Sequence, residues 1–347
     1  MKKLIVLPFI CLLGQLNMFA QGSWNQMQSF TVARFVTSTF EVNGKAYMVG
    51  GLINGGALDD CWEYSSNTWT QKANFPGGLR GGMFSFGANG KGYCGIGGDG
   101  STNTYTTFYE FDPVANSWAS KANFPGLTRY ALGAMIYNGN GYLSNGIDNT
   151  ANVPMNEVYE YNPVTDTWTL KNYIPSTTRF TTSNFTIGQY GYACSGYTGT
   201  AQVQDLWEYD MMNNVWTQKA NFPGIGRTGG CGFGIGNYGY YGLGVDIMSG
   251  PVLNDFYQYD QALNSWNTMT SFNDSFNVYR ASFVLNGKGY VVGGDNGSPQ
   301  FLSNKTWEFT PPIVGENENS ISVSMNICPN PLTETSVITI FDENNLS

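Results

Sequence analysis

The residues with the clearest capacity for chemistry are the arginines, since the chain of 347 residues has six and they recur at nearly regular intervals. Each one stands at the start of an apolar, glycine-containing run that predicts a β-strand. A guanidinium group keeps its charge and presents a planar set of N–H donors, so it can bind a carboxylate through two contacts at once. The six are Arg34, Arg80, Arg129, Arg179, Arg227 and Arg280.

Histidine is absent from the sequence, and this absence excludes several kinds of active site. It removes histidine as a general acid or base, the Ser–His and Cys–His nucleophile pairs, and any metal site that needs imidazole. Polar loops at 99–103 and 295–298 have oxygen ligands suited to calcium, but neither has the spacing of an EF-hand, so a polar turn explains them. We therefore expect no metal, no cofactor and no assignable catalytic residue.

Aromatic residues show that the elements carrying the arginines are repeats. Tryptophans recur 45 to 50 residues apart, and two further aromatic series keep the same register. Each repeat predicts four short strands, because period-two alternation is interrupted by Gly, Asn, Asp and Pro every eight to twelve residues. We expect the aromatic series to form the core between the sheets. The tryptophans are Trp24, Trp69, Trp118, Trp168, Trp216 and Trp266.

These repeats resemble the kelch repeat, in which a glycine doublet, a Tyr-Asp-Pro turn and a tryptophan recur in each blade of a β-propeller. The doublet is Gly50-Gly51, Gly97-Gly98 and Gly293-Gly294 in three repeats, and it is degraded in the other three. The resemblance extends over residues 23–310. It implies an all-β, six-bladed propeller whose first strands surround a central channel.

The last repeat lacks its fourth strand, and the N-terminus can supply it. Residues 280–309 predict three strands, and no tryptophan follows Pro311-Pro312. Residues 23–27 match the fourth strand of the other repeats but have no preceding strands of their own. We therefore predict that this N-terminal strand completes the sixth blade and closes the ring without an exposed sheet edge.

Two interpretations of the arginine series follow from such a ring. In the first, each arginine pairs with a nearby acid or with backbone carbonyls, and the recurrence reflects duplication. In the second, the six lie at one mouth of the channel and bind an anionic ligand. Four repeats have an aspartate after the second strand that could pair with the arginine: Asp99, Asp148, Asp246 and Asp295. The other two repeats predict that Arg34 and Arg179 are freer to meet a ligand, unless they pair with Asp60 and Asp205.

The two ends of the chain predict export from the cytoplasm. Lys2 and Lys3 precede an apolar run at 4–13 that is too short to cross a bilayer, so residues 1–20 are expected to be a cleaved signal peptide. Residues 21–310 then form the propeller and 311–320 a linker. Residues 321–347, with Pro329-Asn330-Pro331, resemble a truncated C-terminal sorting domain of Bacteroidetes type IX secretion, and a disordered tail is the alternative. The five cysteines of the mature chain are odd in number and irregular in spacing, which predicts buried thiols and no disulfide framework.

Charge and resemblance together favour a binding function. The formal net charge is −9 and no basic run is present, so nucleic acid is not expected as a partner. We expect a secreted monomer, extracellular, at the cell surface or in the periplasm, without a membrane span. It would act as a non-catalytic binding module for a glycan or a protein, including an anionic ligand, and Tyr105 and Tyr197 are the loop aromatics that could stack on a sugar.

An enzyme is the alternative. Galactose oxidase has a kelch-type propeller, but its copper site needs histidines that this chain lacks. N-acetylneuraminate epimerase is an exported kelch propeller, and resemblance to it would imply that the arginines hold the substrate carboxylate. Its acid–base pair would then have to come from Asp, Glu or Tyr.

Overall fold

The computed structural model describes residues 21–148, 152–298 and 300–312, and these residues form β-strands and connecting turns. No helix that is long and apolar enough to cross a membrane occurs among them. Contacts divide the chain into two units, Met1–Pro312 and Ile313–Ser347, and all described residues belong to the first. The predicted signal peptide, most of the predicted linker and the sorting-domain-like tail lie outside the described residues.

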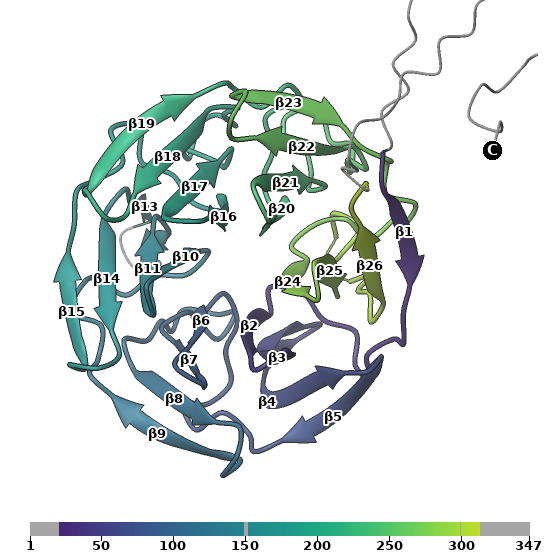
Figure 1. Ribbon diagram of the computed structural model, residues 1–347. Coiled ribbons are helices and arrows are strands. Elements are labelled where there is room, and N and C mark those ends of the chain that lie inside the picture. Colours follow the sequence, from purple (N-terminus) through teal and green to yellow (C-terminus); the bar gives the residue numbers. More distant parts are fainter. Residues whose placement is uncertain (1–20, 149–151, 299, 313–347) are drawn as a thin grey trace, which may run out of the picture. The chain divides into compact units, whose positions relative to one another are not determined.

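Six four-stranded antiparallel sheets are arranged as blades around a central axis, which confirms the predicted six-bladed propeller (Figure 1). We call the strands of each blade a to d, from the axis outward. Blade 1 consists of β2 (Ser38–Val42), β3 (Lys45–Ile53), β4 (Gly56–Ser65) and β5 (Thr68–Lys72). Blade 2 consists of β6 (Phe84–Ala88), β7 (Lys91–Gly95), β8 (Phe108–Asp112) and β9 (Ser117–Lys121). Blade 3 consists of β10 (Gly133–Tyr137), β11 (Asn140–Ser144), β14 (Val158–Asn162) and β15 (Thr167–Leu170), with a small hairpin of β12 (Ile147–Asp148) and β13 (Val153–Pro154).

The remaining blades repeat this order. Blade 4 consists of β16 (Ser183–Ile187), β17 (Tyr190–Cys194), β18 (Leu206–Asp210) and β19 (Val215–Lys219). Blade 5 consists of β20 (Cys231–Ile235), β21 (Tyr238–Gly242), β22 (Phe256–Asp260) and β23 (Ser265–Thr268). Blade 6 consists of β24 (Ala281–Leu285), β25 (Lys288–Val292), β26 (Thr306–Thr310) and β1 (Ser23–Gln26).

The N-terminal strand closes the ring as predicted. In Figure 1 the purple β1 lies beside the yellow β26, and the two pair antiparallel with Trp24 opposite Phe309. The Trp24 ring packs 4.7 to 5.0 Å from the rings of Phe256, Phe272 and Phe309. The outer strand of blade 6 therefore comes from one end of the sequence and its inner strands from the other, so blade 6 forms only when both ends meet.

The innermost strand of each blade, strand a, has one face toward the core and one toward the channel. Side chains alternate across a strand, and in β2 the side chains of Phe40 and Val42 are buried in the core whereas those of Thr39 and Glu41 line the channel. The turn to strand b is tight because Asn43 and Gly44 both have positive φ, at 52° and 73°. Strands a of blades 3, 4 and 6 present the same alternate positions to the channel, whereas in blade 5 both positions are glycines, Gly232 and Gly234.

The core lies between neighbouring blades, as the aromatic series predicts. Six buried clusters each join two adjacent blades, the last one joining blade 6 to blade 1. Strand d tryptophans also donate hydrogen bonds across these junctions, as Trp118 Nε1 does to the Ala73 carbonyl and Trp168 Nε1 does to the Ala122 carbonyl, both at 2.9 Å. The four cysteines within the described residues are buried free thiols, as expected for them.

Candidate functional site: the arginine slots and the central channel

Each of the six arginines is enclosed within its own blade, and their exposed fractions lie between 0 and 5%. Five of them precede strand a by four residues, and Arg280 directly precedes β24. Asn277 therefore takes the place in blade 6 that an arginine has in the other blades. The Arg280 side chain still packs over a phenylalanine, Phe272, as the arginines of blades 1, 2, 3 and 5 do. We call the enclosed space around each guanidinium an arginine slot.

The slots of blades 1, 4 and 5 share one geometry. The guanidinium of Arg34, Arg179 or Arg227 donates one bond to the carbonyl at the end of strand b, at 2.9 to 3.3 Å. It also makes a two-point contact with an aspartate at the start of strand c, with Nη2–Oδ2 distances of 2.8 Å. These aspartates are Asp60, Asp205 and Asp255.

The predicted distinction between free and paired arginines is therefore wrong. Arg34 and Arg179 are fully paired, through the two acids at the start of strand c. Three of the loop aspartates expected to pair with the other arginines accept instead from their own loops: Asp99 from Ser101 N–H at 2.9 Å, Asp246 from Met248 N–H at 2.9 Å and Asp295 from Gly297 N–H at 2.8 Å. Backbone N–H groups two residues further along the loop satisfy these carboxylates, and in blade 5 the guanidinium of Arg227 is already in contact with Asp255 of strand c. A role of the six in ligand binding stays a prediction.

The other three slots depart from this geometry. In blade 3 the partner of Arg129 is Glu157. In blade 6 a lysine, Lys305, replaces the acid of strand c, and Asp274 pairs with both cations, at 2.8 Å to Arg280 and 3.2 Å to Lys305. The two cations hold the pKa of Asp274 below its ordinary value although burial alone would raise it.

Blade 2 has no acid in its arginine slot. Its strand c is preceded by Thr107, whose Oγ1 lies 3.1 Å from Arg80 Nη1, and no carboxylate of the described residues forms an ion pair with Arg80. The guanidinium lies between the rings of Phe75 and Tyr105, 5.2 and 4.0 Å from their centroids, and its buried Nε has no hydrogen-bond partner in the described structure. Burial lowers the pKa of Arg80.

The backbone at the end of strand b forms an unusual turn beside each arginine slot. Two successive residues there have positive φ in every blade, and the second is always glycine, with φ between 81° and 108°. In blade 2 this pair is Ile96-Gly97, one position earlier than the doublet predicted from the sequence. In blades 1 to 5 the carbonyl of the first residue accepts from the arginine Nη1, as Gly50 O does from Arg34 at 2.9 Å, whereas Arg280 Nη1 of blade 6 has no hydrogen-bond partner in the described structure. The recurring arginines thus hold an unusual backbone turn in place.

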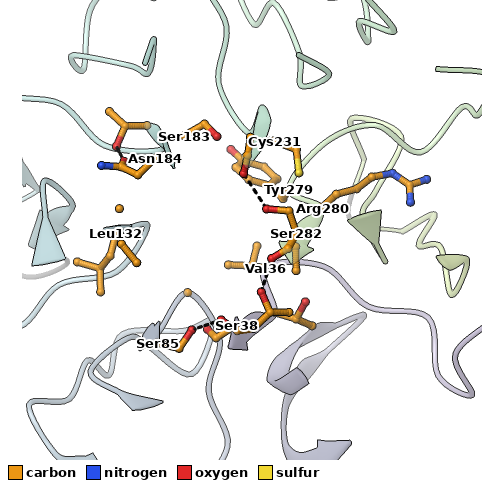
Figure 2. A pocket seen from close by; sticks show the side chains of 18 of the residues that line it. Val36, Ser38, Ser85, Leu132, Ser183, Asn184, Cys231, Tyr279, Arg280 and Ser282 are labelled. Atoms are coloured by element: carbon orange, nitrogen blue, oxygen red, sulfur yellow. Dashed lines mark hydrogen bonds between the residues drawn. The ribbon is translucent and has the colours of Figure 1, made fainter. Parts of the chain in front are cut away.

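A cavity of about 640 Å³ occupies the central channel and is lined by the strands a and the segments before them. Figure 2 shows this channel, with side chains of several blades pointing inward and the guanidinium of Arg280 pointing away from the centre. The polar lining consists mainly of hydroxyl and amide groups, with few charges. It includes Thr37, Ser38, Thr39, Ser85, Thr182, Ser183, Asn184, Thr186 and Ser282.

Three of these hydroxyl groups join neighbouring blades, and we call Thr39, Ser85 and Ser282 the hydroxyl belt. They stand at the same place in three strands a, and each donates to a strand-a carbonyl of the preceding blade. The distances are 2.5 Å from Thr39 to Ser282 O, 2.8 Å from Ser85 to Thr39 O and 2.9 Å from Ser282 to Gly232 O. Each hydroxyl oxygen keeps acceptor capacity after donating its one hydrogen, so the belt can still receive a hydrogen bond from a ligand.

Aromatic rings surround the end of the channel where the chain enters strand a. Phe35, Tyr130, Phe180 and Tyr279 line the cavity and are half-buried. The loop tyrosines that the sequence suggested for sugar stacking are engaged elsewhere. Tyr105 lies over Arg80, and Tyr197 packs on Phe180 at 5.6 Å with its hydroxyl bonded to Gly199 O at 2.8 Å.

Glu41 is the one carboxylate among the described residues that line the cavity. Its Oε1 accepts a hydrogen bond from the Val284 N–H of blade 6 at 3.0 Å, and no lysine or arginine of the described chain forms an ion pair with it. Burial raises the pKa of Glu41 to about 6, and the Val284 N–H only partly opposes this rise. Glu41 therefore differs from the acids of the arginine slots, which are neutralised by a neighbour.

Sequence reasoning did not single out Glu41, although a signal was present. It stands two residues before the Asn43-Gly44 turn, on the side of strand a opposite to the core residues Phe40 and Val42. The equivalent positions of the other blades carry no charge: Gly87, Ile136, Thr186, Gly234 and Val284. Because the sequence analysis relied on residues that recur in every repeat, it did not select Glu41, which is charged in one repeat only.

Comparison with known proteins supports the fold and leaves the family open. No family model matches the chain, and no curated protein matches it. Among solved structures, one titled "Structure of YjhT" has a TM-score of 0.70 at 15% sequence identity, covering 81% of this chain and 95% of that one. At this identity the likeness shows a common propeller fold, and the kelch resemblance stays a prediction.

Proposed function

We propose that this protein is a non-catalytic binding module that takes a hydroxyl-rich ligand, a glycan, in its central channel. The observation that carries the proposal is the combination in one cavity of half-buried aromatic rings at the mouth and uncharged hydroxyl and amide groups within. A sugar presents apolar C–H faces that pack on such rings and hydroxyl groups that bond to such side chains. The cavity volume of about 640 Å³ lies in the range of small-ligand sites and favours a glycan over a folded protein.

Binding is favoured over catalysis by the groups available in the channel. Acid–base chemistry needs two titratable groups with suitable pKa values. The other titratable groups of the described lining are Tyr130, Tyr279, Cys231 and Arg280. Burial raises the pKa of both tyrosines and raises that of Cys231 to about 11, and the Arg280 guanidinium is bound to Asp274. Glu41 thus lacks a partner suited to proton transfer near neutral pH.

A panel of neutral oligosaccharides tests the proposal. Calorimetric titration of the purified protein should find a ligand, and the double variant Tyr130→Ala/Phe180→Ala should bind it roughly tenfold more weakly because two stacking faces are lost. Tyr173→Ala is the matched control, because Tyr173 is 48% exposed and does not line the cavity. Unchanged affinity of the double variant, with an unchanged melting temperature, would place binding outside the channel.

We also propose that this binding takes place after export, on the strength of the N-terminal sequence. Lys2, Lys3 and the apolar run at 4–13 support a signal peptide that is removed before Gln21. N-terminal sequencing of secreted material should read from Gln21 or a neighbouring residue. Secreted protein that retains Met1 would contradict cleavage.

A further inference from the structure

We propose that the glycan bound in the channel is an amino sugar with a free, protonated amine, and that Glu41 is the residue that recognises this amine. The inference rests on the proposed function and specifies its ligand. It would make Glu41 a specificity-determining residue at one end of a cavity whose other polar groups accept or donate neutral hydrogen bonds.

The first observation is the charge balance of the cavity. Among the described residues that line it, Glu41 is the one anion and Arg280 the one cation. The Arg280 guanidinium points away from the channel and is held by Asp274 at 2.8 Å and by the Phe276 carbonyl. A ligand in the channel therefore meets one negative charge and no accessible positive charge from these residues, an arrangement that favours a cation and disfavours a carboxylate-bearing sugar.

The second observation is the lack of a counter-ion for Glu41 on every element packed against it. The nearest lysine on its own hairpin, Lys45, is bonded to Glu63 at 2.8 Å on the other side of the sheet. From blade 6, Val284 presents a backbone N–H and an apolar side chain, and from blade 2, Gly87 presents backbone alone. No titratable group of β3, β6 or β24 therefore neutralises the carboxylate.

The third observation is that Glu41 keeps acceptor capacity toward the cavity. Its Oε1 is used by the Val284 N–H, and no side chain of the described residues donates to Oε2. Charge-assisted bonds between an ammonium group and a carboxylate are about twice as strong as neutral ones, and they strengthen where water is excluded. A bound amine would supply the positive charge that Glu41 lacks among the described residues. An N-acetylated sugar presents a neutral amide at the same place and gains no such bond.

The test compares two tetramers that differ only at nitrogen: β-1,4-linked glucosamine and its N-acetylated counterpart. Titration of the full-length protein near neutral pH and physiological salt should give an affinity roughly tenfold or more higher for the amine form. Glu41→Gln should lower affinity for the amine form to that of the acetylated form and leave the latter unchanged. Asp59→Asn is the control for general attraction between an acidic protein and a cationic sugar, because it removes one negative charge outside the cavity lining.

Each outcome decides between the two proposals. Loss of the preference in Glu41→Gln and its retention in Asp59→Asn support the inference. Equal binding of both tetramers by the unsubstituted protein overturns the inference and leaves glycan binding intact. A preference that survives Glu41→Gln assigns amine recognition to another residue and also overturns it. Failure of both tetramers and of the neutral panel to bind overturns both proposals.

Discussion

The arginine slots and the central channel are both lined by polar side chains, but they treat charge in opposite ways. In five slots a buried guanidinium is neutralised by a carboxylate of its own blade. In the channel the side chains are mostly uncharged, and Glu41 has no counter-ion among the described residues. In blades 1 to 5 the slots recur together with one backbone turn at the end of strand b, whose carbonyl accepts a hydrogen bond from the arginine. The side chains that face the channel differ from blade to blade, and such non-repeated positions are the ones at which a repeat protein can form a specific binding site.

The largest effect is expected from removing the strand that both regions depend on. Deleting residues 23–30 removes β1, so β26 loses its partner and the Trp24 ring leaves the cluster formed with Phe256, Phe272 and Phe309. Blade 6 then has a bare edge, and we expect the loss of cooperative thermal unfolding. A truncated protein that melts as cooperatively and at the same temperature as the intact one would show that β1 is dispensable.

The second effect separates a paired slot from the unpaired one. Arg179→Met leaves Asp205 largely buried without its cation, and we expect unfolding to become easier by about 3 kcal/mol. Arg80→Met removes a buried cation that has no carboxylate partner in the described structure, so only its bonds to Thr107 and to backbone carbonyls are lost and its cost should be smaller, about 1 kcal/mol. Urea denaturation at neutral pH measures both. Equal losses would mean that the carboxylate pairs contribute nothing specific to the slots.

The architecture could be predicted from the sequence because each blade repeats the same aromatic and glycine positions. Six tryptophans in one register determine six blades, and the incomplete last repeat determines that the N-terminal strand closes the ring. The partners of the arginines could not be predicted in the same way, because the sequence offers an acid both in the loop after strand b and at the start of strand c, as with Asp246 and Asp255 of blade 5. Only the backbone path places Asp60 and Asp205 in two-point contact with their arginines.

The candidate site was less predictable for a related reason. Arg280 looked like a member of the series by its spacing, although it stands three residues further along its repeat, where Asn277 occupies the equivalent place. Glu41 looked like an ordinary strand residue, and its significance depends on which neighbours it lacks. A missing counter-ion is a property of three-dimensional packing and leaves no pattern in the sequence.

A third prediction concerns the arginine slot of blade 2, in which a substitution can supply the missing acid. Thr107 already lies 3.1 Å from Arg80 Nη1, at the place where other blades have their acid. Thr107→Asp should therefore stabilise the protein by about 1–2 kcal/mol through a charge-assisted bond. The gain should be absent in the Arg80→Met background. The new carboxylate would have a depressed pKa when folded, so the gain should be present at neutral pH and decline in acid. A gain that persists without Arg80 would assign the effect to the loop.

The smallest effect is expected in the channel, where the fold keeps an unpaired charge. Glu41 has a pKa of about 6 when folded against an ordinary value of 4.5, so the folded protein binds a proton more readily than the unfolded chain. Its contribution to stability is fully present below pH 4.5 and is lost as pH rises through 6. That difference corresponds to at most about 2 kcal/mol, and water in the channel reduces it to about 1 kcal/mol. Glu41→Gln should therefore stabilise the protein at neutral pH and leave acid stability unchanged, as measured by urea denaturation across this range. A bound amine should reverse the sign by stabilising the unsubstituted protein alone. Equal stability of the two proteins at every pH would mean that the Glu41 carboxylate is already solvated. Its ionised form would then carry no burial penalty for a bound amine to offset.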